Sequence, residues 1–203
     1  MYKINNVIIN SFKSSLIASC QPLPQGPLDT PSFVLASAKA SIIGGAKGLR
    51  IEGFKNLKII KKNINLPVIG IKKRVSKKYP IIITPLLSDV EKLSELGAEI
   101  IAFDSTLRER PYSVKSLISK IHSYKKIAMA DCSSIKDAIN AIENGADILS
   151  TTLSGYTNEK LPPKNPDFKL LDQLIKKFKV PIIAEGRFNT PIFYKKAINL
   201  GAH

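Results

Sequence analysis

The sequence predicts an α/β fold, built either as a (β/α) barrel or as an open, doubly wound parallel sheet. Short apolar runs rich in β-forming residues alternate with amphipathic helical stretches along the 203 residues. A Gly-Ala pair plus one further residue recurs at residues 45–47, 97–99, 145–147 and 201–203. A chain of this length can bury most of its apolar surface in one domain, which we take as residues 1–203.

Seven runs are expected to form the strands of the sheet. Each is almost continuously apolar, as parallel strands that are buried on both faces are. They are "LIASC" (16–20), "GLRIE" (48–52), "PVIGI" (67–71), "EIIAFD" (99–104), "KIAMAD" (126–131), "DILSTT" (147–152) and "PIIAEG" (181–186). A shorter run, "PIIIT" (80–84), is either an extra strand or part of a connection between a strand and a helix.

Three further stretches carry apolar side chains at helical spacing and are expected to pack on the sheet as helices. They are residues 88–97, 134–145 and 167–178. Ser88 or Asp89 is the expected cap of the first of these helices. Thr190 and Pro191 are typical of the capping residue and the first residue of one more helix. In the first three Gly-Ala pairs, at residues 45–47, 97–99 and 145–147, the glycine suits the position after a helix end, where φ is positive.

The fourth Gly-Ala pair, Gly201-Ala202, predicts an eighth strand, but only His203 follows it. A closed (β/α)₈ barrel needs that strand. Two interpretations are therefore open: an open sheet of seven strands, or a barrel chain that has been cut short.

Composition excludes several classes of function. The charge of +15 comes almost entirely from lysines spread along the chain. Without an RNA-binding aromatic motif or a recognition helix, we interpret them as solvated helix faces and expect no nucleic-acid partner. No apolar run approaches the roughly 18–20 residues that span a bilayer, so no membrane partner is expected. The charge would still help to attract an anionic small molecule.

Cysteine and histidine usage indicates the compartment. Cys20 and Cys132 fall in strand-like runs without metal-ligand spacing, which fits a reducing cytoplasm. The N-terminal stretch "MYKINNVIIN" lacks the features of a signal peptide. His122 and His203 are isolated in the sequence, so no metal site is expected.

Polar residues stand at the C-terminal ends of the seven predicted strands, where α/β barrels carry their active sites. They are Gln21, Arg50, Glu52, Lys72, Lys73, Arg74, Asp104, Asp131, Thr151, Thr152 and Glu185. A lysine and a glutamate facing each other across a barrel mouth suit proton transfer at carbon, because one can remove a proton and the other can return it.

Purely structural interpretations of these residues stay open. Glu185 and Arg187 could form only an ion pair at the rim, and Lys73 could be a solvated loop lysine. Asp104 and Asp131 could be turn residues.

These stretches also match a known family. "LIASCQ", "GLRIEG", "PVIGIKKR", "MADCSSI", "STTLSGYT" and "IIAEGRFNTP" resemble N-acetylmannosamine-6-phosphate 2-epimerases, in order and from about residue 14 to the last residue. The resemblance implies a (β/α)₈ TIM barrel that lacks its eighth strand and last helix in this chain. It implies an isomerase with no metal and no nucleotide cofactor. The implied reaction is epimerisation at C2 of N-acetyl-D-mannosamine 6-phosphate to N-acetyl-D-glucosamine 6-phosphate, in sialic acid degradation.

The resemblance also assigns roles to residues. It implies that Lys73 and Glu185 are catalytic, while Lys72 stands where the family usually has an apolar residue. It matches Gln21, Arg50 and Asp131 to positions that hold the sugar or orient the lysine. Thr152 at the end of the sixth strand, and Gly186 and Arg187 in the loop after the seventh, complete the residues expected to bind the substrate. The implied partner is a phosphorylated amino sugar, and a homodimer is left open. Because the implied eighth strand carries part of the phosphate site, the alternative function is a catalytically impaired remnant that binds sugar phosphate.

Overall fold

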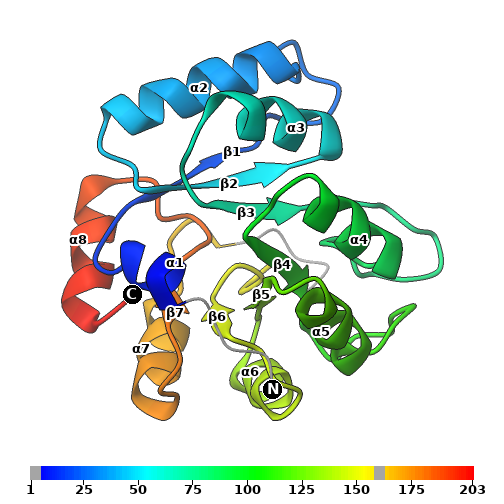
Figure 1. Cartoon of the computed structure of the whole chain (residues 1–203). Helices are drawn as coiled ribbons and strands as arrows, with labels where there is room; N and C mark the ends of the chain where they lie inside the picture. Colours follow the sequence, from blue (N-terminus) through cyan, green and yellow to red (C-terminus); the bar gives the residue numbers. More distant parts are fainter. Residues whose placement is uncertain (1–5, 158–162) are drawn as a thin grey trace.

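The computed structural model describes residues 6–157 and 163–203, and its sheet has seven parallel strands in the order β1 to β7. They are β1 (Ile17–Cys20), β2 (Gly48–Glu52), β3 (Val68–Ile71), β4 (Ile100–Asp104), β5 (Ile127–Asp131), β6 (Ile148–Ser150) and β7 (Ile182–Ile183). Each strand pairs with the next one in the sequence, and the sheet curls until it has an inside and an outside (Figure 1). The predicted α/β fold is confirmed, as a TIM-barrel-like sheet with seven strands in the described residues.

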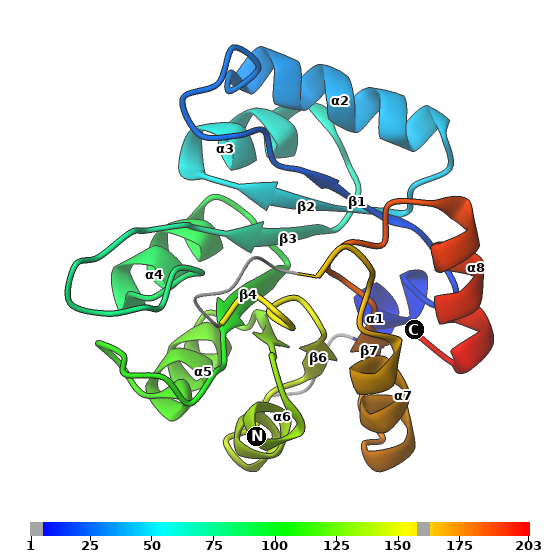
Figure 2. The same ribbon diagram turned by 180° about the vertical axis from the view of Figure 1, so that it is seen from behind.

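Helices surround the curled sheet (Figures 1 and 2). They are α1 (Asn6–Ser11), α2 (Pro31–Ile43), α3 (Phe54–Asn63), α4 (Leu87–Glu95), α5 (Val114–Ser123), α6 (Ile135–Glu143), α7 (Phe168–Lys177) and α8 (Pro191–Leu200). Each of α2 to α8 follows one strand, whereas α1 precedes β1 and covers the N-terminal end of the barrel interior with Ile9 and the following Phe12. A helix with the length and hydrophobicity to cross a membrane is not found among the described residues.

The repeated Gly-Ala pair has the predicted conformation at its first three positions, and the fourth pair adopts the same conformation. The φ angles are +95° at Gly45, +93° at Gly97, +96° at Gly145 and +106° at Gly201. Each following alanine donates its N–H to a carbonyl five residues earlier, in the helix that has just ended: the acceptors are Ser41, Leu93, Ala141 and Ala197. This is the Schellman arrangement, in which a left-handed residue ends a helix and returns the chain toward the sheet.

The last two strands are shorter than predicted. β6 ends at Ser150 and β7 ends at Ile183. Beyond these residues, hydrogen bonds of the Thr151 side chain take the place of the main-chain hydrogen bonds between the two strands. Its hydroxyl donates to the Glu185 carbonyl at 2.7 Å and accepts from the Glu185 N–H at 3.2 Å. The segment that carries Glu185 therefore stays attached to the end of β6.

The run at residues 80–84 belongs to the connection between β3 and α4. Ile83 makes a single antiparallel bridge to Lys73, and the Thr84 N–H donates to the Lys72 carbonyl at 2.7 Å. The run thus folds back along the end of β3 instead of adding a strand to the sheet, which settles the open alternative.

Helix starts were predicted with mixed success. Thr190 caps α8 as expected, because its hydroxyl accepts from the Phe193 N–H at 3.2 Å. The predicted cap of α4 is wrong: Leu86 occupies the capping position and provides no side-chain acceptor. Asp89 instead accepts from the Arg74 guanidinium, with Nη2 at 2.7 Å and Nε at 2.8 Å from Oδ1. The Asp89 carboxylate therefore binds Arg74 and does not cap the start of α4.

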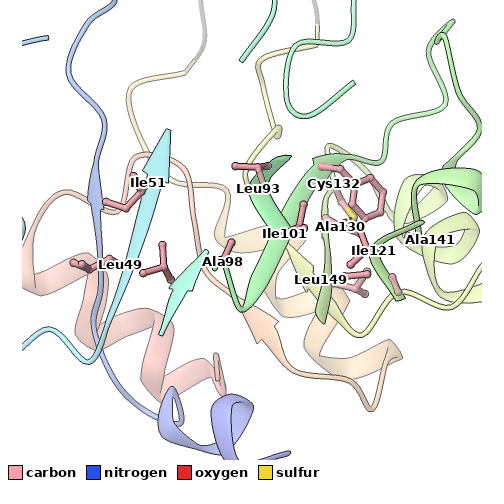
Figure 3. Packing of buried hydrophobic residues seen from close by; sticks show 14 of the residues in the cluster. Leu49, Ile51, Leu93, Ala98, Ile101, Ile121, Ala130, Cys132, Ala141 and Leu149 are labelled. Carbon is pink, nitrogen blue, oxygen red and sulfur yellow. Dashed lines mark hydrogen bonds between the residues drawn. The ribbon is translucent and has the colours of Figure 1, made fainter. Parts of the chain in front are cut away.

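Alternation along the strands separates two hydrophobic clusters. The outer cluster lies between the strands and the helices and includes Leu49, Ile101, Ala130 and Leu149 (Figure 3). The inner cluster fills the barrel with the alternate residues of the same strands, Ile69, Ile71, Ile100, Ala102, Ile127, Met129, Ile148 and Ile183. Because side chains alternate, the residue that continues an inner series also faces the barrel mouth.

β1 and β7 are not paired with each other in the described residues. His203 lies between them: its N–H donates to the Ile182 carbonyl at 2.8 Å, and its carbonyl accepts from the Ser14 N–H. A cavity of about 560 Å³ opens along this side of the barrel, lined by residues of β1, β7 and α8 and also by Arg50 and Glu185.

Candidate active site

The polar residues that the sequence singles out share the inner side of the barrel. Arg50 alternates with two residues of the outer cluster, and Lys73 follows the inner Ile71 at a spacing of two. Asp131 and Glu185 likewise follow the inner residues Met129 and Ile183. Four strands thus direct these side chains to one mouth, as the predicted site requires.

A buried ion pair forms the centre of this mouth. Arg50 Nη2 lies 2.6 Å from Asp131 Oδ2, and Nη1 lies 3.3 Å from Oδ1. The exposed fraction is 3% for the Arg50 side chain and zero for Asp131. Burial alone would lower the pKa of Arg50, but the carboxylates of Asp131 and Glu185 raise it above its usual value. The turn-residue interpretation therefore does not describe Asp131.

Two hydroxyl groups hold the Asp131 carboxylate from the β6 side. The Oγ of Ser150 and the Oγ1 of Thr152 each donate to Asp131 Oδ1 at 2.8 Å. Thr152 was assigned to substrate binding, and here it contacts the ion pair. Ser150 was missed in the sequence, although its position two residues before Thr152 and two after the inner Ile148 was a usable signal.

Lys73 stands at the rim with an altered proton affinity. The residue is exposed, but the protein around it still desolvates the amine. This desolvation, followed by repulsion from Arg50, lowers the pKa of Lys73 below its usual value. Its Nζ makes no hydrogen bond or ion pair with the described residues. A lowered pKa increases the neutral fraction of the amine, which is the form that can accept a proton.

Glu185 brings an unpaired carboxylate oxygen to the same mouth. Its Oε2 is buried and has no hydrogen-bond partner among residues 6–157 and 163–203, and the same holds for Arg50 Nε. Glu185 and Arg187 form no ion pair within these residues, so the rim-pair interpretation fails. Buried polar atoms are normally hydrogen-bonded, and both residues line the cavity beside β1 and β7.

Gly186 and Arg187 shape the loop after β7. Their φ angles are +93° and +67°. Arg187 donates from Nη1 to the Ser154 carbonyl at 2.8 Å and from Nε to the Asn165 carbonyl at 2.9 Å, and it lies 5.0 Å above the Tyr156 ring. The arginine thus ties the loop after β6 to the loop after β7.

Replacing Gly186 by alanine is expected to lower the free energy of unfolding by about 1–2 kcal/mol, because a left-handed φ strains any residue with a Cβ. A Cβ there would also lie 3.3 Å from the Thr152 carbonyl oxygen. Urea unfolding followed by circular dichroism measures the change. Gly44→Ala is the matched control, since Gly44 has a φ of −74°. Equal losses in both variants would contradict the assignment of strain.

Other predicted positions lie at the edge of this arrangement. Gln21 follows β1, and its side-chain amide donates to Ser19 Oγ at 2.7 Å. Asp104 Oδ1 accepts from the N–H and hydroxyl of Thr106, and its Oδ2 pairs with Arg108 at 2.8 Å, so it does act in a turn. No group of three or more His, Cys, Asp or Glu within the described ranges is placed to hold a metal ion.

A family model and two relatives that are similar to this chain carry the same family name. A family model described as "Putative N-acetylmannosamine-6-phosphate epimerase" matches residues 34–203. The chain belongs to this family. Relatives with the corresponding 2-epimerase name come from Pasteurella multocida, 44% identical over 97% of this chain and 85% of the relative, and from Haemophilus influenzae, 45% identical over 96% and 85%.

One solved structure agrees with membership of the epimerase family. The N-acetylmannosamine-6-phosphate 2-epimerase from Clostridium perfringens superposes with a TM-score of 0.93 and 40% identity, over 100% of this chain and 89% of that chain. A structure described as native KDPGal, 17% identical with a TM-score of 0.61, shares the fold alone. As a member of the epimerase family, the chain is an isomerase, and its mouth holds the residues to which the family resemblance assigned catalysis.

Proposed function

We propose that this protein converts N-acetyl-D-mannosamine 6-phosphate to N-acetyl-D-glucosamine 6-phosphate by removing the proton at C2 and returning a proton to the opposite face. The observation that carries the proposal is one barrel mouth with a lysine of lowered pKa and a carboxylate with an unpaired oxygen, on either side of a buried Arg–Asp pair. Family membership supports the same reaction and substrate.

The chemistry needs an acidic carbon and a place for negative charge. In the open-chain sugar, the C1 aldehyde acidifies the neighbouring C2 proton. Either Lys73 or Glu185 takes this proton, which leaves an enolate-like intermediate, and the other group donates a proton to the opposite face. The charge that develops on O1 would be stabilised by Arg50, whose Nε has no partner among the described residues, or by Gln21.

The remaining residues position these groups in the proposal. Asp131, held by Ser150 and Thr152, keeps the Arg50 guanidinium in the mouth. We assign the 6-phosphate to the segment from Gly186 to the start of α8, where Thr190 caps a helix whose N-terminus favours anions. The two cysteines are free and buried, which is compatible with the reducing cytoplasm in which we place amino-sugar degradation.

A second candidate is a remnant that binds the sugar phosphate without turning it over. The observation that favours it is the cavity between β1 and β7, which reaches Arg50 and Glu185 from the side. Water that enters there would weaken the electrostatic interactions on which proton transfer depends.

Incubation of the protein with N-acetylmannosamine 6-phosphate in D₂O tests the proposal. We expect the ¹H signal at C2 to disappear and the signals of N-acetylglucosamine 6-phosphate to grow. The unphosphorylated sugar is the matched control and should react much more slowly, because binding of the remote phosphate contributes to the rate. Calorimetric binding of the phosphorylated sugar without any exchange would reject catalysis in favour of the remnant.

A further inference from the structure

Two lysines stand side by side at the end of β3, and they have different surroundings. Lys73 continues the inner series of Ile69 and Ile71, whereas Lys72 continues the outer one. Lys72 Nζ lies 2.9 Å from Glu52 Oε1 and 5.6 Å from the centre of the Phe54 ring. Both partners belong to the end of β2 and the start of α3, so the Lys72 amine is held there while the Lys73 amine is not.

Glu52 contacts both lysines, but through different groups. Its Oε1 accepts from Lys72 Nζ and also, at 3.1 Å, from the main-chain N–H of Lys73. The exposed fractions of the Lys72 and Glu52 side chains are 25% and 23%. A partly buried pair of this kind is screened less by solvent than a surface pair. Glu52 Oε1 therefore pairs with the Lys72 amine and also fixes the main chain of Lys73.

We propose that Glu52 is a positioning residue that holds the Lys72 amine in an ion pair and fixes the Lys73 main chain, so that Lys73 alone presents its amine to the substrate. This inference rests on the proposed function, in which Lys73 moves a proton at C2. The inference adds a reason why Lys73, and not the adjacent Lys72, is the lysine that acts on the substrate.

The charges around Lys73 make the proposal measurable. Those that face it are Arg50 and Glu52 from β2, Asp131 from β5 and Glu185 after β7, and Lys72 is paired with Glu52. Burial and Arg50 lower the pKa of Lys73, while Glu52 is the first of the carboxylates that raise it. Removing the Glu52 charge should therefore lower the pKa of Lys73. Removing Lys72 leaves the Glu52 carboxylate without its partner amine, so the pKa of Lys73 should then rise.

The test compares Glu52→Gln, Lys72→Met and the double variant by the pH dependence of kcat/KM for C2 exchange. We expect the midpoint that belongs to Lys73 to fall in Glu52→Gln and to rise in Lys72→Met, by roughly half to one pH unit each. In the double variant the midpoint should return close to that of the parent. Glu52→Ala, which also loses the acceptor for the Lys73 N–H, should lose on the order of tenfold in kcat beyond Glu52→Gln.

Two results would overturn the proposal. One is a loss of kcat in Lys72→Met as large as that in Lys73→Met, which would make Lys72 the amine that moves the proton. The other is an unchanged midpoint in both single variants. Glu95→Gln is the matched control, because it removes a carboxylate from the exposed Lys92–Glu95 pair on α4, 3.0 Å apart, and should leave the profile unchanged.

A second measurement separates this proposal from the proposed function. If the parent chain shows no C2 exchange at all, the proposed function fails. The pKa of Lys73 can then be followed by NMR of protein labelled with ¹³C at lysine Cε, with Lys73→Met used to assign its signal. Opposite shifts in Glu52→Gln and Lys72→Met would still support the role of Glu52, and equal pKa values in all variants would reject it.

Discussion

Replacing Lys73 by methionine is expected to lower the rate of C2 deuterium exchange by roughly 10²–10⁴-fold, because in the proposed mechanism it removes a group that transfers a proton at C2. Methionine keeps the length and apolar stem of the side chain. The loss should therefore appear in kcat, with little change in KM. The measurement is the disappearance of the C2 ¹H signal of N-acetylmannosamine 6-phosphate in D₂O.

Glu185→Gln is expected to cause a loss of the same order, since it keeps the shape of the side chain but removes the carboxylate that faces the mouth. Combining it with Lys73→Met should cost little more than either change alone, because in the proposed mechanism both residues act in one reaction. Lys39→Met, at an exposed position on α2, is the control and should exchange at the parental rate. A rate in either site variant within about tenfold of the parent would contradict the proposed proton-transfer pair.

Asp131→Leu is expected to lower the free energy of unfolding by about 3–5 kcal/mol, because it leaves the Arg50 guanidinium buried without its counter-charge. It also removes the acceptor of the Ser150 and Thr152 hydroxyl groups. Urea unfolding followed by circular dichroism measures the loss. No comparable cost is expected where the ion pair is exposed to solvent.

Two comparisons isolate the buried charge as the cause. Asp172→Ala breaks the pair with Lys176, whose side chain is 74% exposed, and should cost only about 0–1 kcal/mol. The double variant Arg50→Met with Asp131→Leu should recover much of the lost stability, because neither charge then remains buried. If the double variant were no more stable than Asp131→Leu alone, the unpaired guanidinium would not be the source of the destabilisation.

Much of the fold could be predicted from the sequence because its signals are local. A buried parallel strand needs a run of apolar residues, and the seven runs each became a strand. A helix that ends in a left-handed residue favours glycine, and Gly45, Gly97, Gly145 and Gly201 all have a φ near +100°. The lengths of β6 and β7 were overestimated because a side chain, Thr151, continues their pairing.

The partners of the site residues could not be predicted in the same way. Nothing local indicates that Asp89 binds Arg74 instead of capping α4, or that Ser150 donates to Asp131. Lys72 and Lys73 are the same residue type side by side, yet within residues 6–157 and 163–203 only Lys72 has a carboxylate partner for its amine. Such choices depend on which side of a strand a residue occupies and on what the neighbouring strand places beside it.

The sequence by itself determined the alternation of strands and helices, the glycine at four helix ends, and which residue types reach the C-terminal ends of the strands. Each of these follows from the conformational and burial preferences of neighbouring residues. Only the tertiary structure decided that Arg50 meets Asp131, 81 positions away, and that both face Glu185 and Lys73. The physical reason is the curl of the sheet, which brings the ends of non-adjacent strands within the range of hydrogen bonds and charge interactions.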